Sequence, residues 1–312
     1  MTQKYNFLLP AYKPDFFKEA LDSILGQTYR DFKLIILDDC SPYDLKSIVD
    51  EYDDDRITYH RNEENMGGKS LVACWNKLLG FADSEYIILA SDDDVYELNF
   101  LEEMDKLAKK YPGVDLLRAR VRAINDNNET IDKDALYEEF VDGLDFLKQK
   151  HFNNALRCIA NYVFKSSVLK ENEGFIDFPL AWYSDDATVM MMAENGAANS
   201  HDMLFNFRSS SISISSRKLS KTDAYKKALA TLLFDKWFQE HIAQRMESYS
   251  KNEYVDKVIR FVTHHHNSFM YQMFSYFSSN CTMGDFRKLL RLLPTRKTRF
   301  RRFYNYLRAK MK

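Results

Sequence analysis

The sequence contains few of the residues that mark fibrous, disordered or disulfide-bonded proteins. Its 312 residues include nine glycines, six prolines and four cysteines, and no internal repeat is present. So little glycine and proline excludes a collagen-like or low-complexity chain. The cysteines lie far apart without a CxxC pair, which argues against a zinc site or a disulfide framework and favours reduced thiols.

Long apolar segments are missing as well. The sequence has no run of ~18 apolar residues, so it predicts no membrane-spanning helix. Residues 1–10 are too short and too polar for a signal peptide, and we therefore expect a cytoplasmic protein. Hydrophobic residues nevertheless make up 45% of the chain and aromatic residues 14%, which is enough to bury a sizeable core.

The formal net charge of −2 hides an uneven distribution of charge. Residues 285–312 contain eleven Lys and Arg and one acidic residue, a balance of +10, so the rest of the chain carries −12. This basic tail also carries leucine and aromatic residues, a combination that suits peripheral contact with the inner face of an anionic cytoplasmic membrane. The alternative is a helix packed on the rest of the protein. No recognised motif accompanies the charge, so we expect no nucleic acid partner.

Apolar strands alternate with helices over the first hundred residues. Continuous apolar runs are separated by segments in which apolar residues recur at helical spacing. This alternation predicts βαβ units, and therefore a Rossmann-like α/β fold with a mostly parallel sheet flanked by helices. The predicted strands span residues 5–9, 32–37, 57–60 and 86–90.

The pattern changes after residue 98, and it predicts a division into domains. Further strands are predicted at residues 114–124 and 155–164, with a polar turn at 126–134, and from residue 222 the chain is helical. We expect a catalytic domain over residues 1–215 and a helical C-terminal region over 216–312 that ends in the basic tail. The catalytic domain would consist of a nucleotide-binding half, residues 1–98, and an acceptor half, residues 99–215.

Candidate ligand-binding residues follow three of the predicted strands, and two of these segments are acidic. In a parallel sheet, ligands bind beyond the C-terminal ends of the strands. Hard divalent ions prefer carboxylate oxygens there, although an acidic turn can also be merely solvated. A buried carboxylate can accept hydrogen bonds from a base or a ribose, or instead cap a helix. The three ends are Pro10-Ala11-Tyr12, Asp38-Asp39 and Asp92-Asp93-Asp94.

Another acidic pair, Asp185-Asp186, opens a predicted helix. Acidic residues are common in the first turn of a helix because they complement its dipole. The functional alternative is a general base that removes a proton from an acceptor hydroxyl.

Taken together, these motifs resemble the family 2 glycosyltransferases, which have the GT-A fold. The resemblance rests on Pro10-Ala11-Tyr12, on SILGQTYRDF at residues 23–32, and on LDDCS at residues 37–41. It continues with Asn65, Gly67 and the Asp92–Asp94 motif, and returns with Asp185-Asp186, Phe207-Arg208 and Ser211–Ser213. About two thirds of the chain is covered.

The resemblance implies a role for each matched residue. Pro10, Ala11 and Tyr12 would line the nucleoside pocket, and Asp38 or Asp39 would bind the base. Asn65, Gly67 and Lys69 would lie near the nucleotide, with Lys69 offsetting phosphate charge. Asp92 and Asp93 would face the ribose or the donor sugar, and Asp94, with Asp92, would hold Mn²⁺ or Mg²⁺. Asp186 would be the catalytic base, and Asp185 would orient the acceptor.

The implied function is inverting, metal-dependent transfer from a nucleotide-sugar, a UDP-sugar by preference, to a saccharide or lipid-linked acceptor in polysaccharide synthesis. A homo-oligomer is compatible with it. The histidine that commonly follows the Tyr-Arg pair is absent, because Ser209 and Ser210 occupy that place. If that histidine is a metal ligand in relatives, water or another residue replaces it here, or metal binding is weak. The alternatives are an inactive sugar-binding module and a sugar nucleotidyltransferase.

Overall fold

The structure, a computed structural model, describes residues 3–152, 156, 158–209, 219–248 and 252–293. The chain divides into two compact units. The first unit contains residues 1–176 and 188–216, and the second contains residues 177–187 and 217–312. The short segment 177–187 therefore belongs with the C-terminal helices and not with the chain on either side of it.

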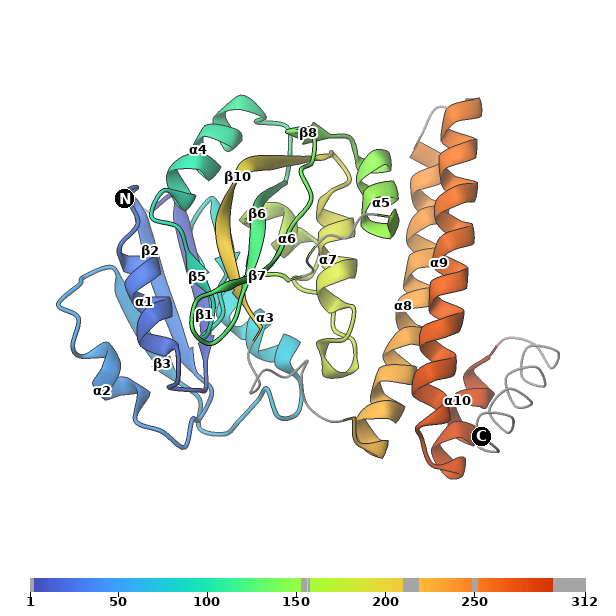
Figure 1. The fold of residues 1–312 in the computed structure, drawn as a ribbon, viewed down its shortest axis with the longest axis horizontal. Helices are drawn as coiled ribbons and strands as arrows, with labels where there is room; N and C mark the ends of the chain where they lie inside the picture. The colour runs from blue at the N-terminus through green and yellow to red at the C-terminus, as the bar shows by residue number, and fades with distance from the viewer. Residues whose placement is uncertain (1–2, 153–155, 157, 210–218, 249–251, 294–312) are drawn as a thin grey trace. The chain divides into compact units, whose positions relative to one another are not determined.

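A ten-stranded sheet organises the first unit (Figure 1). Four neighbouring strands, in the order β3-β2-β1-β4, are parallel. Nearly all residues of β1, β2 and β4 are buried, which is why these strands are continuous apolar runs in the sequence. The elements of this half are β1 (Tyr5–Ala11), α1 (Phe17–Leu25), β2 (Phe32–Asp38), α2 (Leu45–Val49), β3 (Ile57–Arg61), α3 (Leu71–Phe81) and β4 (Tyr86–Leu89). The predicted α/β fold is confirmed.

The rest of the sheet is mixed. Strand β9 is antiparallel to both β4 and β6, while β6 and β10 are parallel, and the edge strand β5 is antiparallel to β10. Two short strands, β7 and β8, pair with β6 and β10. These elements are β5 (Val95–Tyr96), α4 (Phe100–Lys110), β6 (Leu116–Ile124), β7 (Thr130–Lys133), β8 (Phe140–Val141), α5 (Gly143–Phe152), β9 (Tyr162–Lys165), α6 (Ser166–Glu171) and β10 (Ala197–Arg208).

Two local predictions in this part were wrong. The strand expected over residues 155–164 begins only at Tyr162, which follows a turn closed by its own N–H donating to the Ile159 carbonyl at 3.2 Å. The polar turn expected over residues 126–134 contains strand β7. All four residues of β7 are exposed, so no alternation of polar and apolar residues marks it in the sequence.

An aromatic cluster in the core fixes the edge strand β5. The Phe7 ring contacts Phe32 and Tyr96 edge-on, with centroids 5.6 and 5.2 Å apart, and Tyr96 contacts Phe100 at 4.7 Å. Burying such a ring stabilises the fold by about 1.5–3 kcal/mol. Because Tyr96 follows Asp94 by two residues, this packing also holds the acidic turn that precedes it.

The second unit is helical. It contains η1 (Pro179–Ala181), the start of α7 (Ser184–Met192), and α8 (Lys221–Ser248), α9 (Glu253–Ser279) and α10 (Met283–Leu292). Phe274, Phe277 and Phe286 form a core with small residues of α8. Of the basic tail, residues 285–293 are described, and Phe286 and Leu289 are buried there. Residues 294–312, and Ser211–Ser213 of the family motif, lie outside the described residues.

Among the residues that the structure describes, no helix is long and apolar enough to cross a membrane.

Candidate active site

Three of the predicted ligand-binding segments meet at one edge of the sheet. In the parallel register, Ala11 at the end of β1 lies opposite Asp38 at the end of β2, and Asp38 lies opposite Arg61 of β3. Asp92, three residues after β4, accepts hydrogen bonds through one carboxylate oxygen from the backbone N–H groups of Tyr12 and Lys13, both at 2.9 Å. The side chain of Asp92 thereby ties the acidic turn to the end of β1.

The three carboxylates of the acidic turn have different surroundings. Asp93 pairs with the Lys13 ammonium at 3.2 Å, and Asp94 accepts the backbone N–H of Arg208 at 2.8 Å. Burial, followed by the charge of Asp93, raises the pKa of Asp92 and also that of Asp94. The ionised forms of Asp92 and Asp94 are therefore disfavoured in the free protein, and a bound cation or a positively polarised ligand would stabilise them.

Arg208 is a buried residue that the sequence analysis did not place in the site. Its guanidinium is fully covered and donates to the carbonyl oxygens of Asp93 at 2.8 Å and Asn125 at 3.1 Å, and it pairs with Glu19 at 2.7 Å. Arg208 thus joins the acidic turn to α1 through its side chain while its N–H binds Asp94. The Phe207-Arg208 match was the only signal in the sequence, because the partners are 83 to 189 residues away.

Asp39 organises the loop that precedes α3. It accepts the Asn62 side-chain amide at 2.6 Å and the backbone N–H groups of Met66 and Gly67 at 2.8 and 2.6 Å. A Cβ on Gly67 would lie 2.9 Å from the Asp39 carboxylate, so only glycine allows this close approach. The structure gives Asp39 protein partners, and the backbone N–H groups of the loop are the groups it positions.

Asp38 is likewise buried and bonded to protein. It accepts the Ser41 backbone N–H at 2.7 Å and the Tyr59 hydroxyl at 2.6 Å, and it pairs with Arg61. The Ser41 hydroxyl in turn donates to the Tyr12 carbonyl at 2.7 Å. Arg61 and Tyr59 were not predicted as site residues, although their place on β3 beside the Asp38 strand end follows from the register.

The remaining predicted residues of the first unit differ in exposure. Ala11 is buried, whereas the Tyr12 side chain is 39% exposed and therefore available to a ligand. Asn65 accepts the Gly68 N–H and shapes the loop. Lys69 is exposed and pairs with Glu64 at 2.7 Å, so a phosphate would have to compete with this carboxylate. Pro10, the last of the set, is half-buried within β1.

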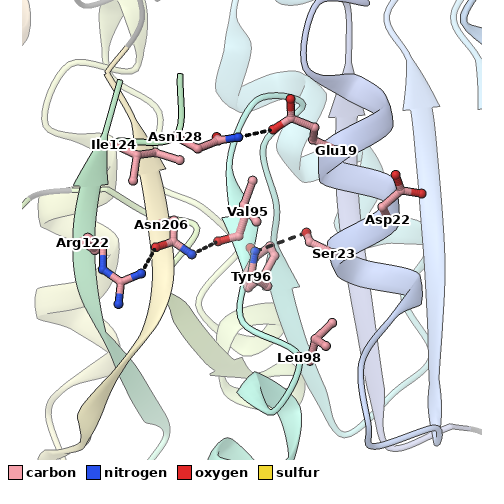
Figure 2. Close-up of a pocket in the computed structure, with 10 residues that line it drawn as sticks. All are labelled: Glu19, Asp22, Ser23, Val95, Tyr96, Leu98, Arg122, Ile124, Asn128 and Asn206. Carbon is pink, nitrogen blue, oxygen red and sulfur yellow. Dashed lines mark hydrogen bonds between the residues drawn. The ribbon is translucent and has the colours of Figure 1, made fainter. Parts of the chain in front are cut away.

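A cavity of about 460 Å³ is lined by residues of α1, β5, β6 and β10. Figure 2 shows that its polar walls are bonded to one another. The Ser23 hydroxyl accepts the Tyr96 N–H at 3.2 Å, and Asn206 donates to the Val95 carbonyl at 3.3 Å. Since Val95 directly follows Asp94, we assign these bonds to holding the acidic turn in place.

The acidic turn does not form a metal cage by itself. Among the residues that the structure describes, no group of three or more His, Cys, Asp or Glu side chains is arranged to hold an ion. One oxygen of Asp92 already accepts two N–H groups, which limits it as a ligand. The raised pKa of Asp94 fits a cation, and Mg²⁺ is commonly held by one or two carboxylates together with substrate phosphates. The residues therefore fit a metal shared with a diphosphate.

Asp185 and Asp186 belong to the second unit. Both lie in the first turn of α7, and Asp186 is 5% exposed whereas Asp185 is half-buried. The segment before them is bent, because Leu180, Ala181 and Tyr183 have positive φ values of 61°, 54° and 69°. Non-glycine residues adopt this conformation only where the surroundings impose it, and such strain clusters at functional sites.

The fold and this arrangement of strand-end carboxylates define the class of protein. Residues 7–173 match the model of the family described as glycosyl transferase family 2. This is more than half of the chain, and the chain belongs to that family. The resemblance noted in the sequence is thereby confirmed.

Relatives share parts of the sequence. The putative colanic acid biosynthesis glycosyl transferase WcaA of Escherichia coli K12 is 35% identical over 105 residues, which cover 31% of this chain and 37% of WcaA. The uncharacterized glycosyltransferase MJ1057 of Methanocaldococcus jannaschii is 30% identical over 159 residues, covering 50% of this chain and 53% of MJ1057. The matches to the first three curated relatives span about a third to a half of their length.

Solved structures share the fold over the whole chain. TarS residues 1–349 of S. aureus, in complex with UDP-GlcNAc, has a TM-score of 0.67 at 17% identity, covering 98% of this chain and 88% of TarS. The mannosyltransferase PcManGT of Pyrobaculum calidifontis, in complex with GDP-Man and Mn²⁺, has a TM-score of 0.53 at 15% identity, covering 100% and 87%. At these identities the likeness shows the GT-A fold alone.

Proposed function

We propose that this chain transfers a sugar from a nucleotide-sugar, a UDP-sugar by preference, to a saccharide or lipid-linked saccharide in polysaccharide synthesis. One observation carries the proposal. Asp92 accepts two backbone N–H groups just after β1, and the buried Asp94, two residues further on, has a raised pKa. Carboxylates whose ionised form is disfavoured therefore lie where the strand ends meet. The family membership and the names of the relatives support the same reaction.

The donor would bind at the strand ends of the first unit. Tyr12 is exposed enough to face a nucleoside, and Asp39 holds the loop before α3 in shape by accepting the N–H groups of Met66 and Gly67. In this proposal Asp38 and Asp39 act by holding that pocket, and Asp93 and Lys13 face the ribose or the sugar phosphate. A divalent cation, Mn²⁺ or Mg²⁺, held by Asp94 and Asp92 together with the diphosphate, would neutralise the charge of the leaving group.

The acceptor would be activated by the second unit. In the proposed inverting reaction, the acceptor oxygen forms a bond to the anomeric carbon from the face opposite the nucleotide. The bond from that carbon to the diphosphate oxygen breaks, and the nucleotide leaves with the electron pair. Asp186 takes the acceptor proton, and Asp185 orients the acceptor hydroxyl. Base catalysis of this kind typically supplies ~10²–10⁴-fold in rate.

The basic tail would add a peripheral membrane contact at the cytoplasmic face, which suits a lipid-linked acceptor. Its described part, residues 285–293, buries Phe286 and Leu289 against the helical unit and leaves Leu292 57% exposed. A homo-oligomer remains part of the proposal without a surface assigned to it.

The test is nucleotide release from UDP-Glc, UDP-GlcNAc and GDP-Man, with and without Mn²⁺, by the purified full chain. We expect free nucleoside diphosphate from one of the UDP-sugars, faster with Mn²⁺ and with added polysaccharide. Release of pyrophosphate from a sugar phosphate and UTP would instead identify a nucleotidyltransferase. Binding of all three donors without turnover under any condition would identify an inactive binding module.

A further inference from the structure

The second unit, which carries the proposed base, also contains a buried histidine. His266, on α9, has no exposed surface, and its Nε2 lies 3.2 Å from the Asp235 carboxylate of α8. Its ring stacks on Phe238 with centroids 3.6 Å apart and an interplanar angle of 10°. The Asp235 carboxylate and the stacked Phe238 ring therefore fix this buried imidazole in place.

The charge of Asp186 reaches this imidazole. Burial lowers the pKa of His266, while Asp235 from α8 and Asp186 from α7 both raise it. A carboxylate only accepts hydrogen bonds, so Nε2 carries the proton toward Asp235.

An aromatic stack connects the same histidine with the bent segment before Asp186. The Tyr183 ring lies parallel to Phe234 at 4.8 Å, and Phe234 contacts both Phe178 at 6.1 Å and His266 at 5.4 Å. The Ser184 hydroxyl accepts the Phe178 N–H at 3.0 Å and closes the bend. The strained φ of Tyr183 is thus held by packing against α8, and the α8–α9 pair shapes the segment that presents Asp186.

We propose that His266, oriented by Asp235 and stacked on Phe238, is a positioning residue for Asp186, so that the helical unit is part of the catalytic machinery. The inference rests on the proposed role of Asp186 as base. A neutral imidazole supplies polar surroundings to the carboxylate without a positive charge. A cation in the same place would favour the ionised carboxylate and make Asp186 a weaker base.

The decisive variant is His266→Phe, which keeps a ring for stacking on Phe238 but removes both nitrogens. The probe is nucleotide release from UDP-Glc, UDP-GlcNAc or GDP-Man, whichever the wild type turns over fastest, measured from pH 5 to 9. We expect kcat to fall about tenfold with the donor KM unchanged. The acid limb of the kcat profile should move to higher pH, because an apolar neighbour raises a carboxyl pKa. His266→Gln, whose amide can still donate to Asp235, should recover most of the rate.

Two further variants make the outcome unambiguous. His264→Phe places the same change on an exposed position of α9 and should leave kcat and the pH profile as in the wild type. Asp186→Asn reports on the base itself. If Asp186→Asn is inactive and His266→Phe retains the wild-type kcat and acid limb, the inference is wrong although the proposed function stands. Full turnover by Asp186→Asn would remove the proposed base, and the inference with it.

Discussion

Two buried acids of the first unit and two buried histidines of the second have pKa values shifted in opposite directions. At the strand ends of the first unit, burial and mutual repulsion raise the pKa of Asp92 and Asp94. In the second unit, burial lowers the pKa of His266, and burial with the charge of Arg245 lowers that of His241 to about 4. Burial disfavours the charged form in both cases, so the first unit holds acids that resist ionisation and the second holds bases that resist protonation.

This difference matches the division of labour that we propose. A site for a diphosphate and its cation binds the cation more tightly when its carboxylates repel one another in the free protein, because the cation removes that repulsion. A scaffold for a general base gains from neutral imidazoles, because a nearby cation would make the base weaker. The comparison predicts that changes in the first unit alter donor binding and that changes in the second alter the chemical step.

The largest effect should come from Asp186→Asn. The amide cannot accept the acceptor proton, so we expect nucleotide release to fall by ~10²–10⁴-fold. UDP affinity, measured by calorimetry, should stay within twofold of the wild type because donor contacts are assigned to the first unit. Loss of UDP binding along with turnover would contradict the assignment of donor binding and chemistry to different units.

Arg208→Met should cause the largest loss of stability in the first unit. Removing this buried guanidinium leaves the carbonyls of Asp93 and Asn125 without their side-chain donor and leaves the Glu19 carboxylate with the Asn128 amide at 3.4 Å. Breaking such a buried network costs about 3–5 kcal/mol in the free energy of unfolding, measured by urea denaturation. Glu19 is itself 46% exposed on its side chain, which places the expected loss at the lower end of that range.

The matched control is Arg120→Met, on the same sheet. Arg120 is only half-buried, and its guanidinium donates to the carbonyls of Asp134 and His201 at 3.1–3.2 Å. Water can replace this donor, so we expect a loss of about 1 kcal/mol. Equal losses for the two variants would mean that Arg208 does not anchor the acidic turn.

The sequence alone predicts the parallel half of the sheet because its strands are buried on both faces. Such strands are continuous apolar runs, and the rule for strand ends then places Asp38, Asp39 and Asp92–Asp94 at one edge. The hydrogen-bond partners of these acids could not be predicted from the sequence. The Arg208 N–H that binds Asp94, for example, is 114 residues away along the chain. The same holds for His266, whose relation to Asp186 depends on how α9 packs and not on any local pattern.

The structure adds the protein partners of Asp38 and Asp39, which the sequence does not indicate. The resemblance implies that Asp38 or Asp39 binds the base, yet their carboxylates are bonded to Ser41, Tyr59, Asn62 and the loop N–H groups. Sequence patterns report that an acid is required at a strand end. They do not report whether it contacts a ligand or holds the loop that does.

His241 offers a direct test of the basic side of the comparison. Its pKa of about 4 in the folded state lies below its ordinary value of 6.5, so the unfolded chain binds the proton more readily. Stability should therefore be full above pH 6.5 and fall as the pH drops toward 4, by about 3 kcal/mol from this residue. His241→Phe keeps a ring for stacking on Trp237, which lies 4.6 Å away, and should remove this part of the slope.

The measurement is urea denaturation of the wild type and the variant at pH 7.5 and at pH 4.5. The exposed His264→Phe again serves as the control, because an exposed histidine should leave the difference between the two pH values unchanged. If the free energy of unfolding changes equally with pH in the wild type and in His241→Phe, this histidine does not have a lowered pKa. The second unit would then lack the residue on which the comparison mainly depends.

Asp94→Asn tests the acidic residues of the comparison, and its effect on stability should have an unusual sign. The raised pKa means that the folded state penalises the ionised carboxylate. This penalty begins as the pH rises above 3.8, the ordinary pKa of an aspartate, and is complete above the pKa of Asp94 in the folded state. Asp94 therefore makes the free wild-type protein less stable at neutral pH than at low pH. Asparagine carries no charge, and its carbonyl can still accept the Arg208 N–H.

The variant should therefore have a higher Tm than the wild type at pH 7.5, and the gain should vanish near pH 3.8. Each kcal/mol corresponds to a shift of roughly 2–4 °C for a chain of this size. UDP binding with Mn²⁺ should weaken at the same time, whereas the exposed Asp55→Asn should change neither quantity. An Asp94→Asn protein that is less stable at pH 7.5 would mean that the carboxylate is compensated in the free protein. The strand ends would then hold no unrelieved charge for a cation to neutralise, and the difference between the two units would be one of residue type alone.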